Sequence, residues 1–499
     1  MTQRKPREFE NTKSRTVTIE ELRAEQARKN AQAAAERNRQ QRTAPSNASA
    51  RPTQAKPVAR PAQPAKKSGG SRKRKGNKGL LALIIAIIVV IIAVVILLVT
   101  GVFGGKNGGE TQPSEKELEG PPQPCIESTA MIGATGDILL HDSVLRGANY
   151  GGYYDFSDSF AAVRPYWSEP DLMIANLEVT LGGEESGSYR GYPSFNAPDA
   201  IIPALMDAGV DMVLTANNHT YDTGEYGMMR TLDVLEDYGM EYTGTRLETS
   251  DPYIRIKDIN GIKIGLTCYT YDTREWPGAQ KSLNGNVMSD EASDKVNSFC
   301  YSDLETFYDS VRDDVAKMKA AGCDATIFFI HWGNEYQDYP SGTQEEIAQT
   351  LCDIGVDVII GGHPHVIQEF DILTNDQGHE MWCLYSMGNT ISSQRKEIMV
   401  PEEPRGYTED GLTIEISYMK FNNGKVKIKG IYILPTWVDW RDDGVFAVVP
   451  LDWKVDAYDW ATAYTGQATD SYNRTLERLG TVYPALRERL GEEKVPDYK

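Results

Sequence analysis

The sequence has no Cys-x-x-Cys pair, no Gly-x-Ser-x-Gly segment and no phosphate-binding loop ending in Gly-Lys-Ser or Gly-Lys-Thr. These absences argue against a thiolate zinc site, a serine nucleophile elbow and ATP use through a P-loop, respectively. Cysteine is scarce, with six in 499 residues, and we find no internal repeat. The content of 40% hydrophobic and 25% charged residues excludes a wholly disordered, collagen-like or disulfide-framework chain.

Charge is divided unevenly along the chain. Residues 1–78 carry 21 Lys and Arg against 6 Asp and Glu, a net charge of +15, whereas residues 79–499 have a net charge of −34. Residues 1–78 are also poor in large apolar side chains, which predicts a largely disordered basic tail. Because the net charges of the two regions have opposite signs, we expect the regions to lie in different environments.

A charge-free apolar run separates these two regions. Residues 80–100 lack any charged side chain, and as a helix they would span about 31 Å, close to one hydrocarbon core. Seven Lys and Arg residues lie just before the run, and positive residues stay on the cytoplasmic side. We therefore expect a transmembrane helix over 79–100, a cytoplasmic tail over 1–78 and the main domain outside the cell membrane. A cleaved signal peptide or a buried core helix is the alternative. The Gly- and Pro-rich stretch 101–124 is interpreted as a linker.

The remainder reads as an α/β domain. Apolar, β-branched runs alternate with helical patterns over 224–238, 303–321 and 343–354, and later strands are closer to antiparallel. The domain is predicted over 125–437, followed by a mostly helical C-terminal extension over 438–499. Most of the cysteines are expected to be free thiols, because several fall in apparent strands or core.

Histidines mark a candidate site. Five of the six histidines fall at the ends of apparent strands, where ligands collect in α/β sheets, and each has Asp, Glu or Asn nearby. An isolated histidine on such a segment is more often structural, but five together point to a metal centre. Imidazole, carboxylate and amide ligands suit Mn, Fe or Zn, and a shared carboxylate suits two ions. The candidates are Asp137, His141, Asn176, Glu178, Asn218, His219, Asp222, His331, Glu335, His363 and His365.

The spacing of these residues makes local predictions. His363 and His365 are two residues apart, so in an extended segment both face one side. Asp222 follows His219 by three and is expected either to hold the far nitrogen of its imidazole or to cap the next helix. Glu335 is a substrate contact or an exposed loop carboxylate. Asn389 donates to a substrate or caps a turn.

Six segments in order resemble the CapA-type capsule-biosynthesis family of poly-γ-glutamate synthesis proteins, whose fold is of the calcineurin-like metallophosphoesterase type. The segments cover about residues 128–395 and read GDILLHD, NLE, ANNHTYDTGEYG, HWGNEY, GGHPHVIQ and YSMGN, with the later Gln394. The resemblance implies a four-layer α/β/β/α sandwich with the site at the strand ends.

The resemblance also implies two divalent metal ions. It assigns Asp137, Glu178 and His365 to one ion, and Glu178, Asn218, His331 and His363 to the other, with Glu178 bridging. His219 would protonate the leaving group. The usual Asp-x-His of the first strand is stretched here, so that His141 follows Asp137 by four residues. Asn176 competes with Glu178 for the bridging place.

The sequence is compatible with three functions. The first is a membrane-anchored protein that acts in the synthesis, export or anchoring of an anionic capsular polymer such as poly-γ-glutamate, together with other membrane proteins. The second is a surface phosphoesterase, in which hydroxide held by two metals attacks phosphorus and His219 is the acid. The third is a non-catalytic module that binds a polymer or a partner. Nucleic acid is not an expected partner.

Overall fold

The computed structural model describes residues 125–274, 276–396, 399, 407–451 and 465–479. All of them belong to one compact unit, Glu115–Lys499. The predicted basic tail 1–78, transmembrane helix 79–100 and linker 101–124 lie outside the described residues. Among the described helices, none combines the length and apolar character needed to cross a bilayer.

The first sheet has eight strands and is built around the long strand β1. Strands β1, β2, β3 and β4 are parallel neighbours, while β15, β16 and β17 continue the sheet on the other side of β1 in antiparallel fashion. Strand β14 pairs with the end of β1. The bounds are β1 Ile126–Ile138, β2 Leu172–Leu177, β3 Met212–Leu214, β4 Glu241–Thr243, β14 Asn389–Ile391, β15 Asp410–Phe421, β16 Val426–Trp440 and β17 Phe446–Pro450.

The second sheet has seven strands with a parallel centre. Strands β6, β10, β11 and β13 run parallel, and β5 and β12 close the two edges in antiparallel fashion. The bounds are β5 Arg255–Ile259, β6 Ile262–Tyr271, β9 Ser298–Phe299, β10 Ala325–His331, β11 Val358–Gly362, β12 Phe370–Thr374 and β13 Glu380–Leu384. A separate hairpin, β7 Ser282–Leu283 and β8 Asn286–Val287, follows β6.

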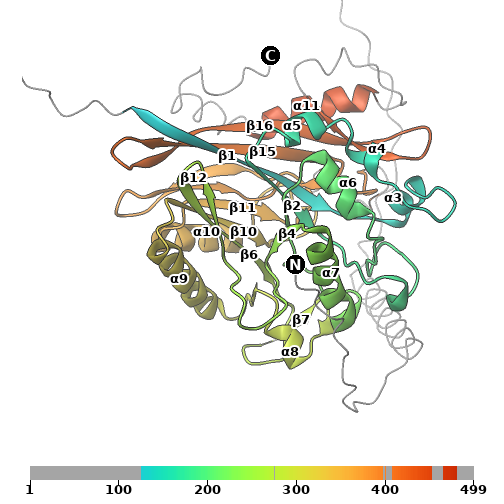
Figure 1. Cartoon of the computed structure of the whole chain (residues 1–499), viewed down its shortest axis with the longest axis horizontal. Coiled ribbons are helices and arrows are strands. Elements are labelled where there is room, and N and C mark those ends of the chain that lie inside the picture. Colours follow the sequence, from blue (N-terminus) through green and yellow to red (C-terminus); the bar gives the residue numbers. More distant parts are fainter. Residues whose placement is uncertain (1–124, 275, 397–398, 400–406, 452–464, 480–499) are drawn as a thin grey trace, which may run out of the picture. The chain divides into compact units, whose positions relative to one another are not determined.

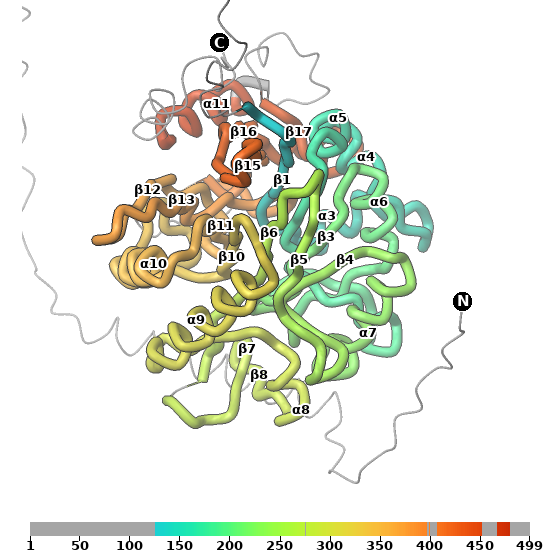
Figure 2. Tube along the Cα trace, turned by 60° about the vertical axis from the view of Figure 1, so that its left-hand side comes forward, coloured from blue at the N-terminus to red at the C-terminus, as the bar shows by residue number. Residues whose placement is uncertain are grey.

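Alternating side chains bury both faces of each sheet. In β10, Ile327 and Phe329 join the apolar cluster shared by the two sheets, whereas Phe328 and Ile330 join the cluster beneath the helices of the second sheet. Figures 1 and 2 show the two groups of helices on opposite sides of the paired sheets. The four-layer α/β/β/α arrangement predicted above is therefore confirmed for the described residues.

The three helices predicted inside the domain correspond to α7, α9 and α10, and the described residues add five shorter α-helices that were not predicted. The first sheet is covered by α6 and α7 and the shorter α3, α4 and α5, and the second by α9 and α10. Helix α10 starts with a capping box in which Ser341 and Gln344 satisfy each other's backbone. The bounds are α3 Asp142–Gly147, α4 Ser157–Phe160, α5 Arg164–Trp167, η1 Glu184–Ser186, α6 Ile201–Ala208, α7 Gly224–Tyr238, α8 Asp290–Ser293, α9 Leu304–Ala320, α10 Gly342–Ile354 and α11 Thr465–Leu479.

The C-terminal region differs from the expectation in one respect. Strand β16 continues past the boundary placed at 437, and β17 adds an edge strand to the first sheet, so the sheet domain extends to Pro450. Helix α11 does lie in the predicted helical extension. It is tied to the domain by Arg474, which binds Asp410 through two nitrogens.

All six cysteines have free thiols, as expected for most of them.

Candidate metal centre

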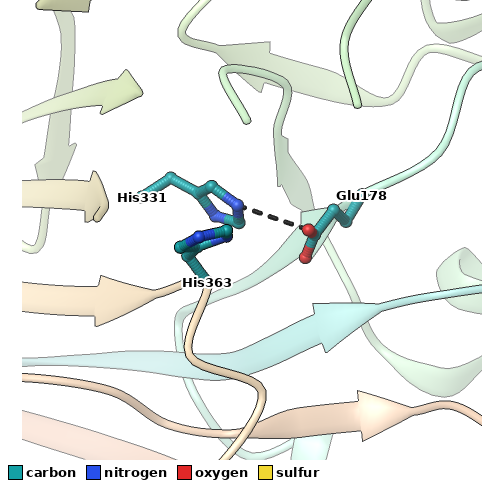
Figure 3. A group of neighbouring side chains, drawn as sticks. All are labelled: Glu178, His331 and His363. Carbon is teal, nitrogen blue, oxygen red and sulfur yellow. Dashed lines mark ion pairs between the residues drawn. The ribbon is translucent and has the colours of Figure 1, made fainter. Parts of the chain in front are cut away.

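The candidate side chains are brought together by the carboxyl ends of parallel strands from both sheets. Asp137 lies at the end of β1, and Glu178 directly follows β2. His331 is the last residue of β10, and His363 directly follows β11. Parallel strands end at one edge of a sheet, and here the two edges meet. Figure 3 shows Glu178, His331 and His363 turned toward one another.

Glu178 is the most unusual side chain of this cluster. It is 0% exposed, and neither carboxylate oxygen accepts a hydrogen bond. Its Oε1 lies 3.3 Å from Nε2 of His331 and 3.8 Å from Nε2 of His365. A buried carboxylate without hydrogen bonds is costly unless positive charge compensates it. Both oxygens are thus available to cations.

Two groups of donor atoms share this carboxylate. Asp137, Glu178 and His365 form one group, and Glu178, His331 and His363 form the other; within each, the ligand atoms lie within 4.8 Å of one another. In addition, Oδ1 of Asn218 lies 2.7 Å from Nε2 of His331. These are the two sets that the resemblance implied, and their nitrogen and oxygen donors fit divalent transition metals.

The charges of the cluster also suit a cation. Burial would raise the pKa of Asp137, but the hydrogen bond and charge of His365 outweigh burial and lower it. Burial, with His331 and His365 nearby, lowers the pKa of His363 well below its usual value, so this ring is neutral. Its Nδ1 is buried and has no hydrogen-bond partner. For His365, the charges of Glu178 and Asp137 outweigh burial and raise the pKa to about 9.

The backbone conformation of the GGHPHV segment differs from the expected one. It is bent rather than extended, because both histidines have positive φ, 96° for His363 and 58° for His365. Non-glycine residues rarely adopt this conformation, and such strain is found mostly at functional sites. The backbone N–H of His363 donates to Oδ2 of Asp137 at 3.1 Å, and Nδ1 of His365 lies 3.1 Å from the same oxygen.

His219 and Asp222 form a buried pair beside the cluster. Nδ1 of His219 lies 2.7 Å from Oδ2 of Asp222. Thr223, not Asp222, is the N-cap residue of α7, and no side chain caps this helix. Of the two interpretations of Asp222, the structure therefore supports the one in which it orients His219. Burial would lower the pKa of His219, but the charge and hydrogen bond of Asp222 outweigh it and raise this pKa.

Replacing Asp222 with asparagine should lower the pKa of His219 in the metal-free protein. The substitution removes the charge that outweighs burial, so the pKa should fall from above to below its usual value. Titration of the ring nitrogens by NMR in full-length protein measures it. Asp376→Asn, a change of the same kind at an exposed position, is the control and should leave the His219 pKa where it is. An unchanged pKa in Asp222→Asn would rule out the proposed pairing.

Two predicted ligands are placed outside the metal groups. His141 belongs to neither group, because the longer spacing carries it past β1 to the N-cap of α3, where its ring packs edge-on against Phe195. Burial and the nearby His365 and His219 lower its pKa to about 4. Asn176 does not replace Glu178; its amide donates to Oδ1 of Asp137 at 2.7 Å. Its amide therefore orients a candidate ligand from a buried position.

The two remaining candidates differ from each other. Asn389 is buried, and its amide donates to Oε1 of Gln394 and to the carbonyl of Thr408, so the expected donation to a substrate is replaced by a structural role. Glu335 is exposed, yet its carboxylate groups with the ring nitrogens of His363 and His365 within 4.8 Å. It therefore lies at the mouth of the site.

Sequence reasoning missed Asn284, which is in the β7–β8 turn. Its Oδ1 accepts from Nδ2 of Asn218 at 3.1 Å, and its Nδ2 lies 3.2 Å from Nδ1 of His219. The Asn-Gly dipeptide at 284–285 is a clear turn signal. Nothing in the local sequence indicates that this turn meets a segment 66 residues earlier.

Comparisons with known proteins agree on one family. The family model described as "Bacterial capsule synthesis protein PGA_cap" matches residues 131–394. Capsule biosynthesis protein CapA of Bacillus anthracis is 28% identical over 52% of this chain and 59% of its own length. PGA biosynthesis protein CapA of Bacillus subtilis is 27% identical over 52% of this chain and 62% of its own length. This chain thus spans about three fifths of the length of these curated relatives.

Among solved structures, NAD nucleotidase of Haemophilus influenzae matches 70% of this chain and 60% of its own, with 15% identity and a TM-score of 0.37. So distant a likeness bears neither on the fold nor on the function of this chain.

Proposed function

This chain belongs to the PGA_cap family of bacterial capsule synthesis proteins, and we propose that it acts outside the cell membrane in making a capsular polymer such as poly-γ-glutamate. We propose further that its chemical step is hydrolysis of a phosphoester or a related bond at a pair of divalent metal ions. The proposal combines two of the functions that are compatible with the sequence, the role in capsule synthesis and the metal-dependent phosphoesterase. Other membrane proteins of polymer synthesis are its proposed partners.

This proposal rests mainly on the surroundings of the Glu178 carboxylate. Its carboxylate is fully buried, accepts no hydrogen bond and is shared by two groups of ligand atoms. A site that had become a relic would gain stability by losing a buried carboxylate whose oxygens accept no hydrogen bond. The chain keeps this carboxylate between three histidines, an arrangement that is explained if two cations bind on either side of it.

Bound there, two divalent cations would supply a nucleophile from water and neutralise charge that develops on the phosphoryl group. The protein's own residues account for the rest of the site. Glu178 would be shared by the two ions, Asp137 with His365 would hold one, and Asn218 with His331 and His363 would hold the other. Oδ2 of Asp222 accepts a hydrogen bond from Nδ1–H of His219, so that the proton on Nε2 of His219 is the one available to the leaving oxygen.

The proposed location follows from the sequence outside the described residues. The charge-free run 80–100 is long enough for one membrane span, and the Lys- and Arg-rich residues before it favour the cytoplasmic side. The net charge of −34 beyond residue 78 would repel an anionic polymer at long range, so such a polymer would meet the protein best at a cationic metal pair.

Protease added to intact cells should remove the C-terminal part if the tail is cytoplasmic and the main domain lies outside the membrane.

The capsule role is tested by complementation in cells that have lost this gene. The unmodified gene should restore surface polymer, and Glu178→Gln should not, at equal protein level. Glu305→Gln, the same change on the exposed face of α9, is the matched control and should restore it fully. Full restoration by Glu178→Gln would exclude a metal-dependent role in polymer synthesis, and unchanged polymer after gene loss would exclude any role.

A further inference from the structure

Asn218 can serve a cation in only one of its two side-chain orientations. The carbonyl oxygen of an asparagine is a metal ligand, whereas its NH₂ group is a donor that repels a cation. In the structure, Oδ1 of Asn218 points toward Nε2 of His331 at 2.7 Å, and Nδ2 points the other way. Something on the far side must therefore accept a hydrogen bond from Nδ2 and keep the amide from turning over.

The far side is occupied by the tip of the β7–β8 hairpin. Oδ1 of Asn284 accepts from Nδ2 of Asn218 at 3.1 Å. Nδ2 of Asn284 in turn lies 3.2 Å from Nδ1 of His219. One exposed turn residue thus contacts both a metal-ligand candidate and the candidate acid, two buried residues that are adjacent in the chain.

The hairpin tip is held firmly enough to act as a support. Asn284 and Gly285 both have positive φ, 50° and 75°, as a tight two-residue hairpin turn requires. The N–H of Gly285 donates to Oγ1 of Thr273, just beyond β6, at 3.1 Å. On the other side, Oγ of Ser289 donates to Oε2 of Glu225 on α7 at 2.6 Å. The hairpin is therefore anchored between the second sheet and a helix of the first.

We propose that Asn284 is a positioning residue that fixes the carbonyl of Asn218 toward the cation position shared with His331 and His363. This proposal rests on the proposed function for the presence of the cation, but the orientation of Asn218 does not depend on it. Loss of a residue that hydrogen-bonds to a metal ligand and orients it typically lowers the metal affinity by about 10- to 100-fold.

Two substitutions separate the hydrogen bond from the turn. Asn284→Gly keeps a residue that tolerates positive φ but removes the acceptor, and it should weaken the binding of one of two Mn²⁺ ions to the full-length protein by about 10- to 100-fold. Asn284→Asp keeps the acceptor and should bind both ions as tightly as the unmodified protein or more tightly. Asn286→Ala, at an exposed position on the same hairpin, is the control and should change neither affinity. Calorimetric titration with Mn²⁺ measures all four proteins.

A second readout needs no metal. In metal-free protein, the side-chain NH₂ of Asn218 should exchange with solvent faster in Asn284→Gly than in the unmodified protein, and at the original rate in Asn284→Asp. If the unmodified protein binds no Mn²⁺, the proposed function fails, and the exchange rate alone decides the role of Asn284. Unchanged exchange and unchanged affinity in Asn284→Gly would each overturn the proposal.

Discussion

Replacing Glu178 with glutamine will lower the metal content of the full-length protein from two equivalents to fewer than one. The carboxylate is common to both groups of ligand atoms, so both positions lose a charged donor at once. The amide keeps the shape of the side chain but not its charge, and we expect the affinity for Mn²⁺ or Zn²⁺ to fall at least about 100-fold, or about 2.7 kcal/mol. Equilibrium dialysis followed by elemental analysis measures the loss.

Thermal unfolding provides the matching test for Glu178. A ligand that binds only the folded state stabilises it by mass action, so added metal should raise the melting temperature of the unmodified protein. The same addition should leave Glu178→Gln unmoved, while Glu305→Gln should respond as the unmodified protein does. If Glu178→Gln still binds two equivalents, the bridging role assigned to this carboxylate is wrong.

Replacing His219 with alanine should slow phosphoester hydrolysis by about 10²- to 10⁴-fold, the range expected for loss of a general acid. His219 is in neither group of ligand atoms, so the metal content should not change. The loss should be larger for phenyl phosphate than for p-nitrophenyl phosphate, because a poorer leaving group depends more on protonation.

The control for this variant is the sixth histidine. His379 precedes β13, where its Nε2 contacts the carbonyl of Val356, and it is not part of the metal groups. His379→Ala should hydrolyse both esters at the unmodified rate. Equal losses for the two esters in His219→Ala, or no loss, would remove His219 from the role of acid.

Much of the fold could be predicted because its signals are local. The helical periods over 224–238, 303–321 and 343–354 coincide with α7, α9 and α10 within one residue or so at each end. The apolar runs that end in His331 and before His363 are strands buried on both faces, which gives them their continuous hydrophobic character. The sequence therefore indicates which polar side chains lie at strand ends, and the resemblance assigns them to two groups.

The remaining features depend on tertiary contacts that no local pattern encodes. The bend at His363 and His365 is set by Asp137 and by the N–H of Tyr336, which donates to the carbonyl of Pro364 at 2.8 Å. An extended segment was the natural expectation from an alternating His-Pro-His. Similarly, β16 runs to Trp440 because β17 pairs with its last residues, a partnership formed only after the chain turns back.

Tertiary contacts that no local pattern encodes also place His141 and Asn284. Four residues after Asp137, His141 has already left β1 and is the N-cap residue of the following helix, where spacing alone does not show which way the ring points. Asn284 is recognisable as a turn residue, but its neighbours Asn218 and His219 lie in the turn that follows β3 of the first sheet. Such long-range contacts are decided by packing of the layers.

Anomalous diffraction from crystals soaked in Mn²⁺ or Zn²⁺ will show whether Glu178 bridges two divalent cations. We expect two anomalous peaks, one next to Asp137 and His365 and the other next to His331 and His363, with the Glu178 carboxylate between them. A single peak that Glu178 does not contact, or no peak in this cluster at all, would contradict the bridging role.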